Sequence, residues 1–131
     1  MNNYKNLSIY IILTLSLMLT SCTSNGINSP DHVVEAYYQA LAEKNSSEVA
    51  NLSCSRWESE AKIEAESFSA VETSLENLEC QVAGTSGEYT VISCRGKIIA
   101  NYGNEVLEID LENQKYQVVQ ENGSWRMCGY Q

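Results

Sequence analysis

The spacing of apolar residues divides the chain into three stretches with different periods. An uncharged, apolar run comes first, from residue 7 to residue 20. From residue 30 to residue 79, apolar side chains recur every three or four residues, which predicts amphipathic helices. From residue 80 onward they alternate with polar ones, which predicts strands. The pattern therefore indicates an apolar leader followed by a domain of helices and then strands.

The helical stretch is punctuated by residues that favour helix starts. Ser29 is predicted to be an N-cap, with Pro30 as the first helical residue. Asn45-Ser46 predicts a break and the cap of a shorter helix. Two matches to the S-x-x-E capping box, at residues 55–58 and 69–72, predict two further helices. The apolar sets of these four helices are Val33, Tyr37, Ala40 and Leu41; Val49 and Leu52; Trp57, Ala61, Ala65 and Phe68; and Val71, Leu75 and Leu78.

The strand stretch is divided by turn residues. Residues 84–87 predict a hairpin whose second strand covers residues 89–101, with Ile92, Cys94, Ile98 and Ala100 on one face. Asn122-Gly123 predicts a second hairpin, because both residues tolerate a positive φ. Between the hairpins, Leu107, Ile109 and Leu111 alternate with acidic residues, which predicts a half-buried strand with an acidic outer face. Helices followed by antiparallel strands predict an α+β domain, with the helices packed on one side of a twisted sheet.

The leader has the features of an export signal. Lys5 precedes an uncharged run of 14 residues, whereas spanning the hydrocarbon core of a membrane takes about 20. The sequence Leu19-Thr20-Ser21-Cys22 resembles the lipobox of bacterial lipoproteins. That resemblance implies a signal peptide at residues 1–21, acylation (palmitate) of Cys22 and a polar tether at residues 22–29. Simple secretion and an uncleaved anchor are the alternatives.

These features predict a location as well as a processing step. The lipid on Cys22 would hold the domain at the cell membrane or the outer membrane, outside the cytoplasm. Two or more acyl chains anchor a protein stably, whereas one binds only marginally.

The charge of the mature chain limits its partners. Residues 23–131 carry 7 basic and 17 acidic side chains, a net charge of −10, and residues 30–79 alone carry −8. Such a surface argues against nucleic acid and against direct contact with anionic lipid. Either the acidic helical face is simply solvated, or it recruits a basic partner or divalent cations.

Four cysteines remain in the mature domain: Cys54, Cys80, Cys94 and Cys128. An even number outside the cytosol favours two disulfides. A zinc site is the alternative, although the spacings of 26, 14 and 34 residues lack the close pairs that zinc sites use. Of the three possible pairings we favour Cys80–Cys94, within one hairpin, and therefore Cys54–Cys128.

The sequence offers little catalytic chemistry. His32 is the single histidine, and no phosphate-binding loop or metal motif is recognisable, so we expect no metal, no cofactor and no enzyme activity. Glu60 and Glu64, four residues apart, could chelate a cation but more simply face solvent. Asp110 could act as a general base beside Tyr37 or Tyr116, or could face solvent.

The aromatic residues permit two interpretations. Tyr37, Trp57, Tyr116 and Trp125 could line a small-molecule pocket, because aromatic rings with a polar tip suit one. They could equally be core residues.

The mature domain resembles a family of bacterial lipoproteins with a nuclear-transport-factor-2-like (cystatin-like) domain at residues 30–131. The resemblance rests on the first helix, the Asn45-Ser46 break and the final strand Trp125–Tyr130. It implies a cone, in which a curved antiparallel sheet surrounds the N-terminal helix. Because this fold hosts many functions, the resemblance implies no particular reaction.

Three functions follow as hypotheses. The first is a non-enzymatic, lipid-anchored cell-envelope protein whose domain binds an unknown protein or small molecule, or has a structural role. The second is a small lyase or isomerase with a carboxylate base in the cone. The third is an envelope inhibitor or immunity-type protein that docks a basic partner through its acidic helical face.

Overall fold

The computed structural model describes residues 28–131. The predicted signal peptide, Cys22 and the tether as far as residue 27 lie outside the described residues. Three helices come first: α1 (Pro30–Ala42), α2 (Ser46–Asn51) and α3 (Glu58–Ser69). The strands β1 (Glu72–Ser86), β2 (Tyr89–Asn101), β3 (Val106–Asp110), β4 (Lys115–Glu121) and β5 (Ser124–Tyr130) follow, with a short 3₁₀ helix at Leu111–Asn113. The prediction of an α+β domain is confirmed.

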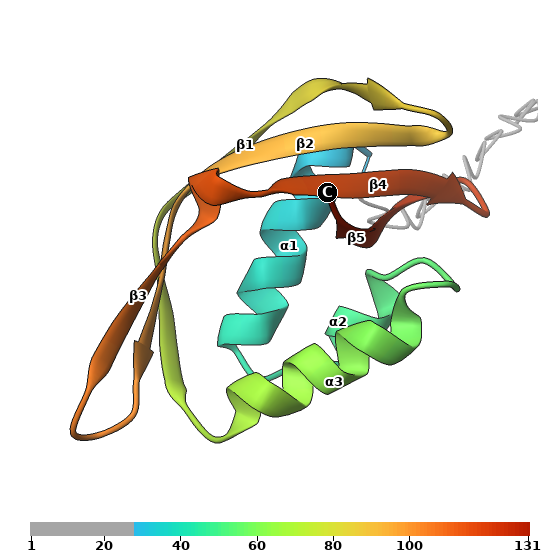
Figure 1. Cartoon of the computed structure of the whole chain (residues 1–131). Coiled ribbons are helices and arrows are strands. Elements are labelled where there is room, and N and C mark those ends of the chain that lie inside the picture. The colour runs from blue at the N-terminus through green and yellow to red at the C-terminus, as the bar shows by residue number, and fades with distance from the viewer. Residues whose placement is uncertain (1–27) are drawn as a thin grey trace, which may run out of the picture.

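The strands form one antiparallel sheet, and the helices lie on one side of it (Figure 1). Its strand order is β1-β2-β4-β5. The long strand β2 pairs with β1 along one side. On its other side it pairs with β4 through residues 90–93 and with β3 through residues 97–101. The β2–β3 hairpin lies at one end of the sheet, where the end of β2 still pairs with the start of β1, and its tip projects from the domain (Figure 1).

The start of α1 and the cap of α2 are where the sequence predicts them. Pro30 is the first residue of α1, although the Ser29 side chain makes no capping hydrogen bond. The Asn45 side chain accepts from the backbone N–H of Glu48 at 3.1 Å, which caps α2.

Both predicted capping boxes are wrong. The helix α3 begins only at Glu58, and Ser55 instead donates its backbone N–H and its hydroxyl to Glu121 of β4. Ser69, the start of the second box, is the last residue of α3.

The predicted fourth helix, with Val71, Leu75 and Leu78, is also wrong. These residues belong to β1 and the turn before it, and β1 contains a bulge between Glu76 and Glu79. Asn77 in the bulge has a φ of +52°. An extra residue in a strand shifts its alternation by one position. The spacing of three between Leu75 and Leu78 therefore matched the periodicity of a helix, although both residues lie in a strand.

Gly96 of β2 lies opposite this bulge and makes room for it. A Cβ at Gly96 would lie 2.5 Å from the carbonyl oxygen of Glu76 and 2.7 Å from that of Asn77. No side chain larger than hydrogen fits there without moving the backbone of β1.

Both hairpins are present close to where the sequence predicts them. Asn122 and Gly123 form a two-residue turn, with φ values of +52° and +78°. The turn between β1 and β2 consists of Gly87 and Glu88, at the end of the predicted segment 84–87. In β2, the predicted face of Ile92, Cys94, Ile98 and Ala100 is buried throughout.

The prediction for β3 was wrong in its burial. Leu107 is 44% exposed and Ile109 is half-buried, while Leu111 is fully buried but lies in the 3₁₀ helix. The strand thus exposes apolar side chains that the alternating pattern placed in the core.

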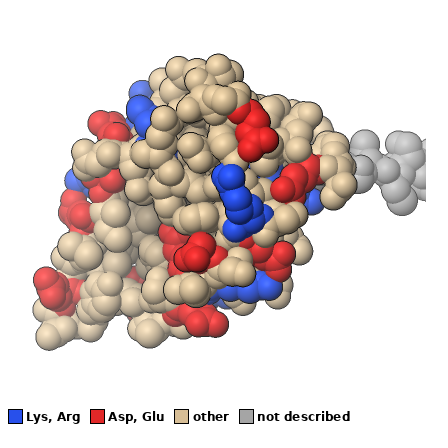
Figure 2. Space-filling model, turned by 45° about the vertical axis from the view of Figure 1, so that its right-hand side comes forward, with Lys and Arg blue, Asp and Glu red and all other residues tan. Residues whose placement is uncertain are grey.

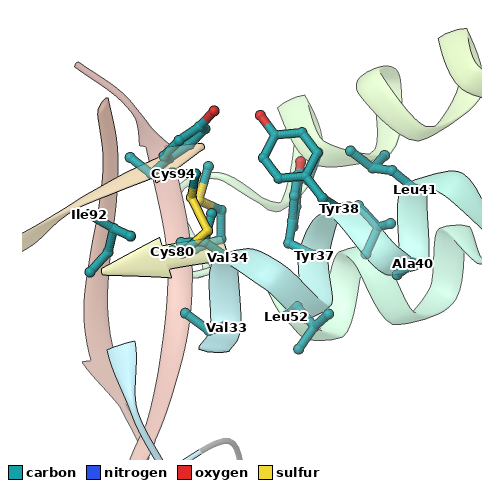
Figure 3. Packing of buried hydrophobic residues seen from close by; sticks show 14 of the residues in the cluster. Val33, Val34, Tyr37, Tyr38, Ala40, Leu41, Leu52, Cys80, Ile92 and Cys94 are labelled. Atoms are coloured by element: carbon teal, nitrogen blue, oxygen red, sulfur yellow. A yellow bond between two sulfur atoms is a disulfide. The ribbon is translucent and has the colours of Figure 1, made fainter. Parts of the chain in front are cut away.

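The core lies between α1 and the sheet. Val33, Val34, Tyr37 and Leu41 of α1 are buried in the same cluster as Ile92 and Cys94 of β2 (Figure 3). On the other side of the domain, residues 52–54 run beside β5. Cys54 donates its N–H to the carbonyl of Met127 at 2.8 Å, and Met127 donates to the carbonyl of Leu52 at 2.7 Å. This pairing covers the edge of β5.

Two disulfides cross-link the fold, as the sequence predicts. Cys80–Cys94 joins directly opposed residues of β1 and β2, and Cys54–Cys128 ties the segment after α2 to β5. Their sequence separations are 14 and 74 residues. In the chain-entropy account, closing loops of these lengths stabilises by about 3 and about 4.5 kcal/mol. The longer bridge therefore fixes the helical half of the domain against the sheet.

Candidate functional site

The residues that the sequence singled out lie in different parts of the domain. Cys22 lies outside the described residues. His32 is exposed at the start of α1, with its Nε2 4.0 Å from the carboxylate of Glu35. Asp110 is exposed on β3, where its carboxylate accepts the N–H of Glu112 at 2.9 Å. The structure thus places the carboxylate suggested as a base in contact with solvent and bonded to the backbone N–H of Glu112.

The four aromatic residues proposed to line a pocket surround the core. Tyr37 and Tyr116 have no exposed surface, while Trp57 and Trp125 are half-buried and pack against the core. Tyr116 donates its hydroxyl to the carbonyl of Leu111 at 3.2 Å. The rings of Tyr37, Trp57 and Tyr116 make edge-to-face contacts with neighbouring aromatic rings. In one of them, Tyr38–Tyr116, the centroids are 5.6 Å apart. A pocket-lining role for these residues stays a prediction.

A carboxylate held between two tyrosines is the main polar feature of the interior. Tyr37 of α1 donates to one oxygen of Glu64 at 2.5 Å, and Tyr130 of β5 donates to the other. Trp57 stacks edge-on against Tyr130, with ring centroids 5.4 Å apart. We call Tyr37, Glu64 and Tyr130 the tyrosine–glutamate cluster. It joins α1, α3 and β5 by hydrogen bonds between side chains.

The environment of this cluster keeps its hydroxyls protonated. Burial raises the pKa of Tyr37 well above the usual value of tyrosine, and the charge of Glu64 raises it further. Burial likewise raises the pKa of Tyr130, with the neighbouring Tyr38 and Glu64 adding to the effect. Both hydroxyls therefore act as donors to the carboxylate across the physiological pH range.

The sequence carries a signal for Glu64 in the spacing of α3. Trp57, Ala61, Ala65 and Phe68 mark the apolar face of this helix, and Glu64 lies on the same face, three residues after Ala61. It is half-buried, whereas Glu60 is exposed. Both carboxylate oxygens of Glu64 accept tyrosine hydroxyls, so Glu64 is not free to form the suggested chelating pair with Glu60. Across residues 28–131, no group of three or more potential metal ligands gathers.

The outer face of the sheet carries two shallow depressions. The larger, of about 610 Å³, is lined by Glu76, Glu79, Arg95, Lys97, Asp110 and Glu112, among others. Arg95 pairs there with Glu79, and Lys97 with Glu108 at 2.6 Å, so the basic groups are neutralised within the domain. The smaller, of about 340 Å³, lies beside the Cys80–Cys94 disulfide. Both depressions are open to solvent.

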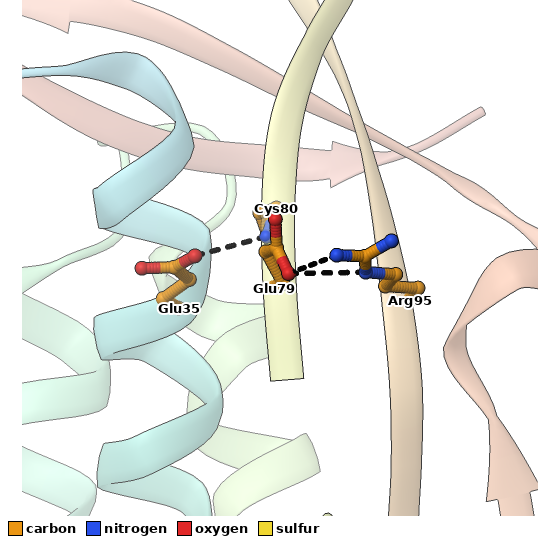
Figure 4. A network of polar contacts seen from close by, with 4 residues as sticks. All are labelled: Glu35, Glu79, Cys80 and Arg95. Atoms are coloured by element: carbon orange, nitrogen blue, oxygen red, sulfur yellow. Dashed lines mark hydrogen bonds and ion pairs between the residues drawn. The ribbon is translucent and has the colours of Figure 1, made fainter. Parts of the chain in front are cut away.

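On the opposite side of β1, Glu35 of α1 binds the strand itself. Its carboxylate accepts the backbone N–H of Cys80 at 2.9 Å, while Glu79 points the other way, toward Arg95 (Figure 4). Acidic side chains are spread over the surface with few basic ones between them (Figure 2).

Among residues 28–131, three of the five exposed large apolar side chains lie at the tip of the β2–β3 hairpin, and the other two are Ile63 of α3 and Val82 of β1. Tyr102, Val106 and Leu107 are 55%, 60% and 44% exposed. Of the described residues, none pairs with the outer edge of β3. We call residues 102–110 the β3 arm. Because exposed apolar side chains and an unpaired strand edge both favour contact with another chain, this arm is the candidate functional site.

Within residues 28–131, no helix combines the length and apolar character that crossing a membrane requires.

Comparisons with known proteins show a similarity of fold alone. A solved structure of a SEC-C motif-containing protein from Rhodopseudomonas palustris aligns with this one at a TM-score of 0.50 and 14% sequence identity, covering 79% of this chain and 78% of that chain. No family model and no curated protein matches the chain.

The resemblance to nuclear-transport-factor-2-like lipoproteins is therefore wrong, because the structural similarity is to a different kind of protein. That resemblance rested on core positions of one helix and one strand, which many domains of helices on a sheet share. The comparison supports an α+β domain whose fold is similar to that of a SEC-C motif-containing protein.

Proposed function

We propose that this protein is a non-enzymatic, lipid-anchored cell-envelope protein whose domain binds a protein partner through the β3 arm. The observation that carries the proposal is the exposure of Tyr102, Val106 and Leu107 beside a strand edge that no described residue pairs with. Exposed single apolar residues are common, but Val106 and Leu107 lie on the two faces of one open strand edge, where an added chain would contact both.

The packing of the interior supports an external binding surface. Tyr37, Tyr38 and Tyr116 fill the space between α1 and the sheet. We propose that the curved sheet and the helices form a cone of the cystatin-like kind, which is filled by these side chains. A ligand would then bind on the outside of the cone.

The anchor is a separate part of the proposal. It rests on the apolar run before Cys22 and on the lipobox-like residues 19–22. The two disulfides support it, because they persist in oxidising compartments outside the cytosol.

Cell fractionation tests the anchor. We expect the wild-type chain in the membrane fraction after a high-salt wash, labelled by a fatty-acid analogue. Cys22→Ser should be unlabelled and released. Retention of Cys22→Ser on washed membranes would contradict the lipid anchor.

Photo-crosslinking in cells tests the partner site. A photoreactive amino acid at Leu107 should give a discrete crosslinked band with another protein. The same amino acid at Glu66, exposed on α3, is the control and should not give that band. Equal crosslinking from both positions would contradict a specific site on the β3 arm.

The tyrosine–glutamate cluster favours one alternative, a small isomerase with Glu64 as its base. Carboxylates near tyrosine hydroxyls serve proton transfer in such enzymes. Conversion of a β,γ-unsaturated ketone, followed by ultraviolet absorbance, distinguishes the two functions. We expect no conversion above buffer; conversion that Glu64→Gln abolishes would favour the isomerase.

A further inference from the structure

The hydrogen-bond pattern of the β3 arm determines which backbone groups face outward. Tyr102 donates its N–H to the carbonyl of Glu105 at 2.8 Å, next to the pair Asn101–Val106. In an antiparallel ladder, hydrogen-bonded and non-hydrogen-bonded pairs alternate. Leu107 and Ile109 therefore bond to β2, while the N–H and C=O groups of Val106, Glu108 and Asp110 point away from it. This outer edge has the spacing that a further strand requires.

The other edges of the sheet are blocked. The outer edge of β1 is interrupted by two bulges, and the N–H of Cys80 is bound by Glu35. Bulges and covered donors prevent a strand from being added. The edge of β5 pairs with residues 52–54. Among the described edges, β3 is thus the one that presents a regular, unpaired row.

The side chains of β3 give this edge a definite chemistry. Residues 105–112 contain Glu105, Glu108, Asp110 and Glu112 and no basic residue. Val106, Glu108 and Asp110 share the outer face of the sheet, and Leu107 and Ile109 share the inner face, because strand side chains alternate. On the outer face, Glu108 is paired with Lys97 of β2 at 2.6 Å, and Asp110 makes no ion pair with any described residue. An added strand would therefore meet an excess of acidic over basic groups on one face and apolar residues on the other.

We propose that β3 binds an extended segment of a partner protein by strand addition, and that this segment alternates basic with apolar residues. The inference rests on the proposed function and deepens it by naming the partner's chemistry. Lysine or arginine at two positions, two residues apart, would face Glu108 and Asp110. The residues beside them would cover Leu107 and Ile109. Main-chain hydrogen bonds supply affinity in this mode, and side chains supply specificity.

A second copy of this chain is the wrong occupant. Antiparallel pairing of β3 with itself would bring Glu108 or Asp110 of one copy close to the same acids of the other. Like charges on directly opposed strands are destabilising. Charge complementarity therefore favours a basic segment over self-association.

Peptide binding tests this inference on the full exported chain carrying Cys22→Ser. The probe is a short peptide in which lysine and valine alternate, measured by calorimetry. Three control peptides are measured beside it. The first has glutamate in place of each lysine, the second has the same residues with the lysines grouped together, and the third has N-methyl groups along one edge. We expect binding of the alternating peptide, and at least about tenfold weaker binding of each control.

Two variants test the same edge from the protein side. Glu108→Lys combined with Asp110→Asn should weaken binding about tenfold and favour the glutamate peptide; the amide introduced by Asp110→Asn keeps an oxygen that accepts from Glu112. Its matched control, Glu60→Lys with Glu66→Gln, changes the net charge equally on α3 and should bind like wild type. Val106→Pro removes an outward N–H that makes no hydrogen bond to β2. It should also weaken binding about tenfold.

The outcomes separate this inference from the proposed function. Equal binding of the alternating and grouped peptides, or equal loss in the α3 control, would overturn strand addition in favour of general charge attraction. Dimers in sedimentation that Val106→Pro abolishes would overturn the basic partner in favour of a second copy. If Leu107 crosslinks a protein in cells but the alternating peptide does not bind, the partner's chemistry is wrong and the proposed function stands. If Leu107 gives no specific crosslink, the proposed function itself fails.

Discussion

The carboxylate of Glu35 on α1 accepts the backbone N–H of Cys80 on β1, at the residue where the disulfide to Cys94 crosses to β2. Cys80 and Cys94 lie directly opposite each other, with Cα atoms 4.1 Å apart. So short a separation is typical of a non-hydrogen-bonded pair, whose N–H groups point away from the partner strand. Glu35 thus supplies the acceptor for the N–H of Cys80, which has no acceptor within the sheet.

Removing this acceptor should destabilise the domain. We expect Glu35→Ala to lower the free energy of unfolding by about 1–3 kcal/mol, because the N–H of the buried Cys80 loses its partner. Glu35→Gln keeps an acceptor oxygen and should lose less than half as much. Urea unfolding measures both, and an equal loss in the two variants would contradict the hydrogen bond.

The tyrosine–glutamate cluster should contribute to stability as a unit. Tyr37→Phe and Tyr130→Phe should each cost about 1.5–3 kcal/mol, because each hydroxyl donates to a charged group. Tyr102→Phe, at an exposed position, is the control and should change stability by about 0.5 kcal/mol at most. In a double-mutant cycle with Glu64→Gln, we expect the losses to be non-additive. Additive losses would show that the hydroxyls do not act through Glu64.

The raised pKa values of the buried tyrosines predict a loss of stability in alkali. Below pH 10, tyrosines are protonated in both states and contribute no pH dependence. Above the usual pKa of 10.0, the unfolded chain releases protons that Tyr37, Tyr38 and Tyr130 retain when folded. The free energy of unfolding should therefore fall as pH rises, by about 1.4 kcal/mol per pH unit for each such tyrosine.

Urea unfolding at a series of pH values checks this slope. Tyr130→Phe should reduce the slope by the contribution of one tyrosine, about 1.4 kcal/mol per pH unit. A free energy of unfolding that stays constant between about pH 9 and about pH 11.5 would mean that these tyrosines titrate normally in the folded state.

Gly96, the one glycine of β2, should be harder to replace than Gly103, which follows the strand. Gly96→Ala places a Cβ 2.5 Å from a backbone oxygen of Glu76 and also strains a φ of +107°. Gly103→Ala strains a φ of +91° but meets no atom within 4 Å, so it isolates the conformational part. We expect Gly96→Ala to cost at least about 2 kcal/mol more than Gly103→Ala in thermal or urea unfolding. Equal costs would mean that the bulge opposite Gly96 moves freely.

The sequence predicted best where the chain follows one period without interruption. The buried face of β2 and the Asn122-Gly123 turn are examples, because local spacing and turn chemistry determine them. It failed at residues 71–78, because the bulge at Asn77 adds a residue that shifts the alternation. Neither S-x-x-E match forms a capping box: α3 begins at Glu58 with Trp57 as its N-cap residue, and Ser69 ends that helix.

The tyrosine–glutamate cluster and the candidate site on the β3 arm were predictable only in part. Glu64 lies at helical spacing from Ala61, which could have indicated that it faces inward. Its partner Tyr130 is 66 residues away, and no local pattern connects them. The open edge of β3 depends on β2 pairing with both β3 and β4 on one side, which is a property of the whole sheet.

Amide hydrogen exchange on β3 tests the central claim most directly. In the free chain carrying Cys22→Ser, the amides of Leu107 and Ile109 should exchange slowly, because they bond to β2. Those of Val106, Glu108 and Asp110 should exchange fast. Saturating amounts of the alternating lysine–valine peptide should slow these three amides to the rate of their neighbours. Unchanged exchange at Val106, Glu108 and Asp110 with the peptide bound, or slow exchange there in the free chain, would contradict an open binding edge on β3.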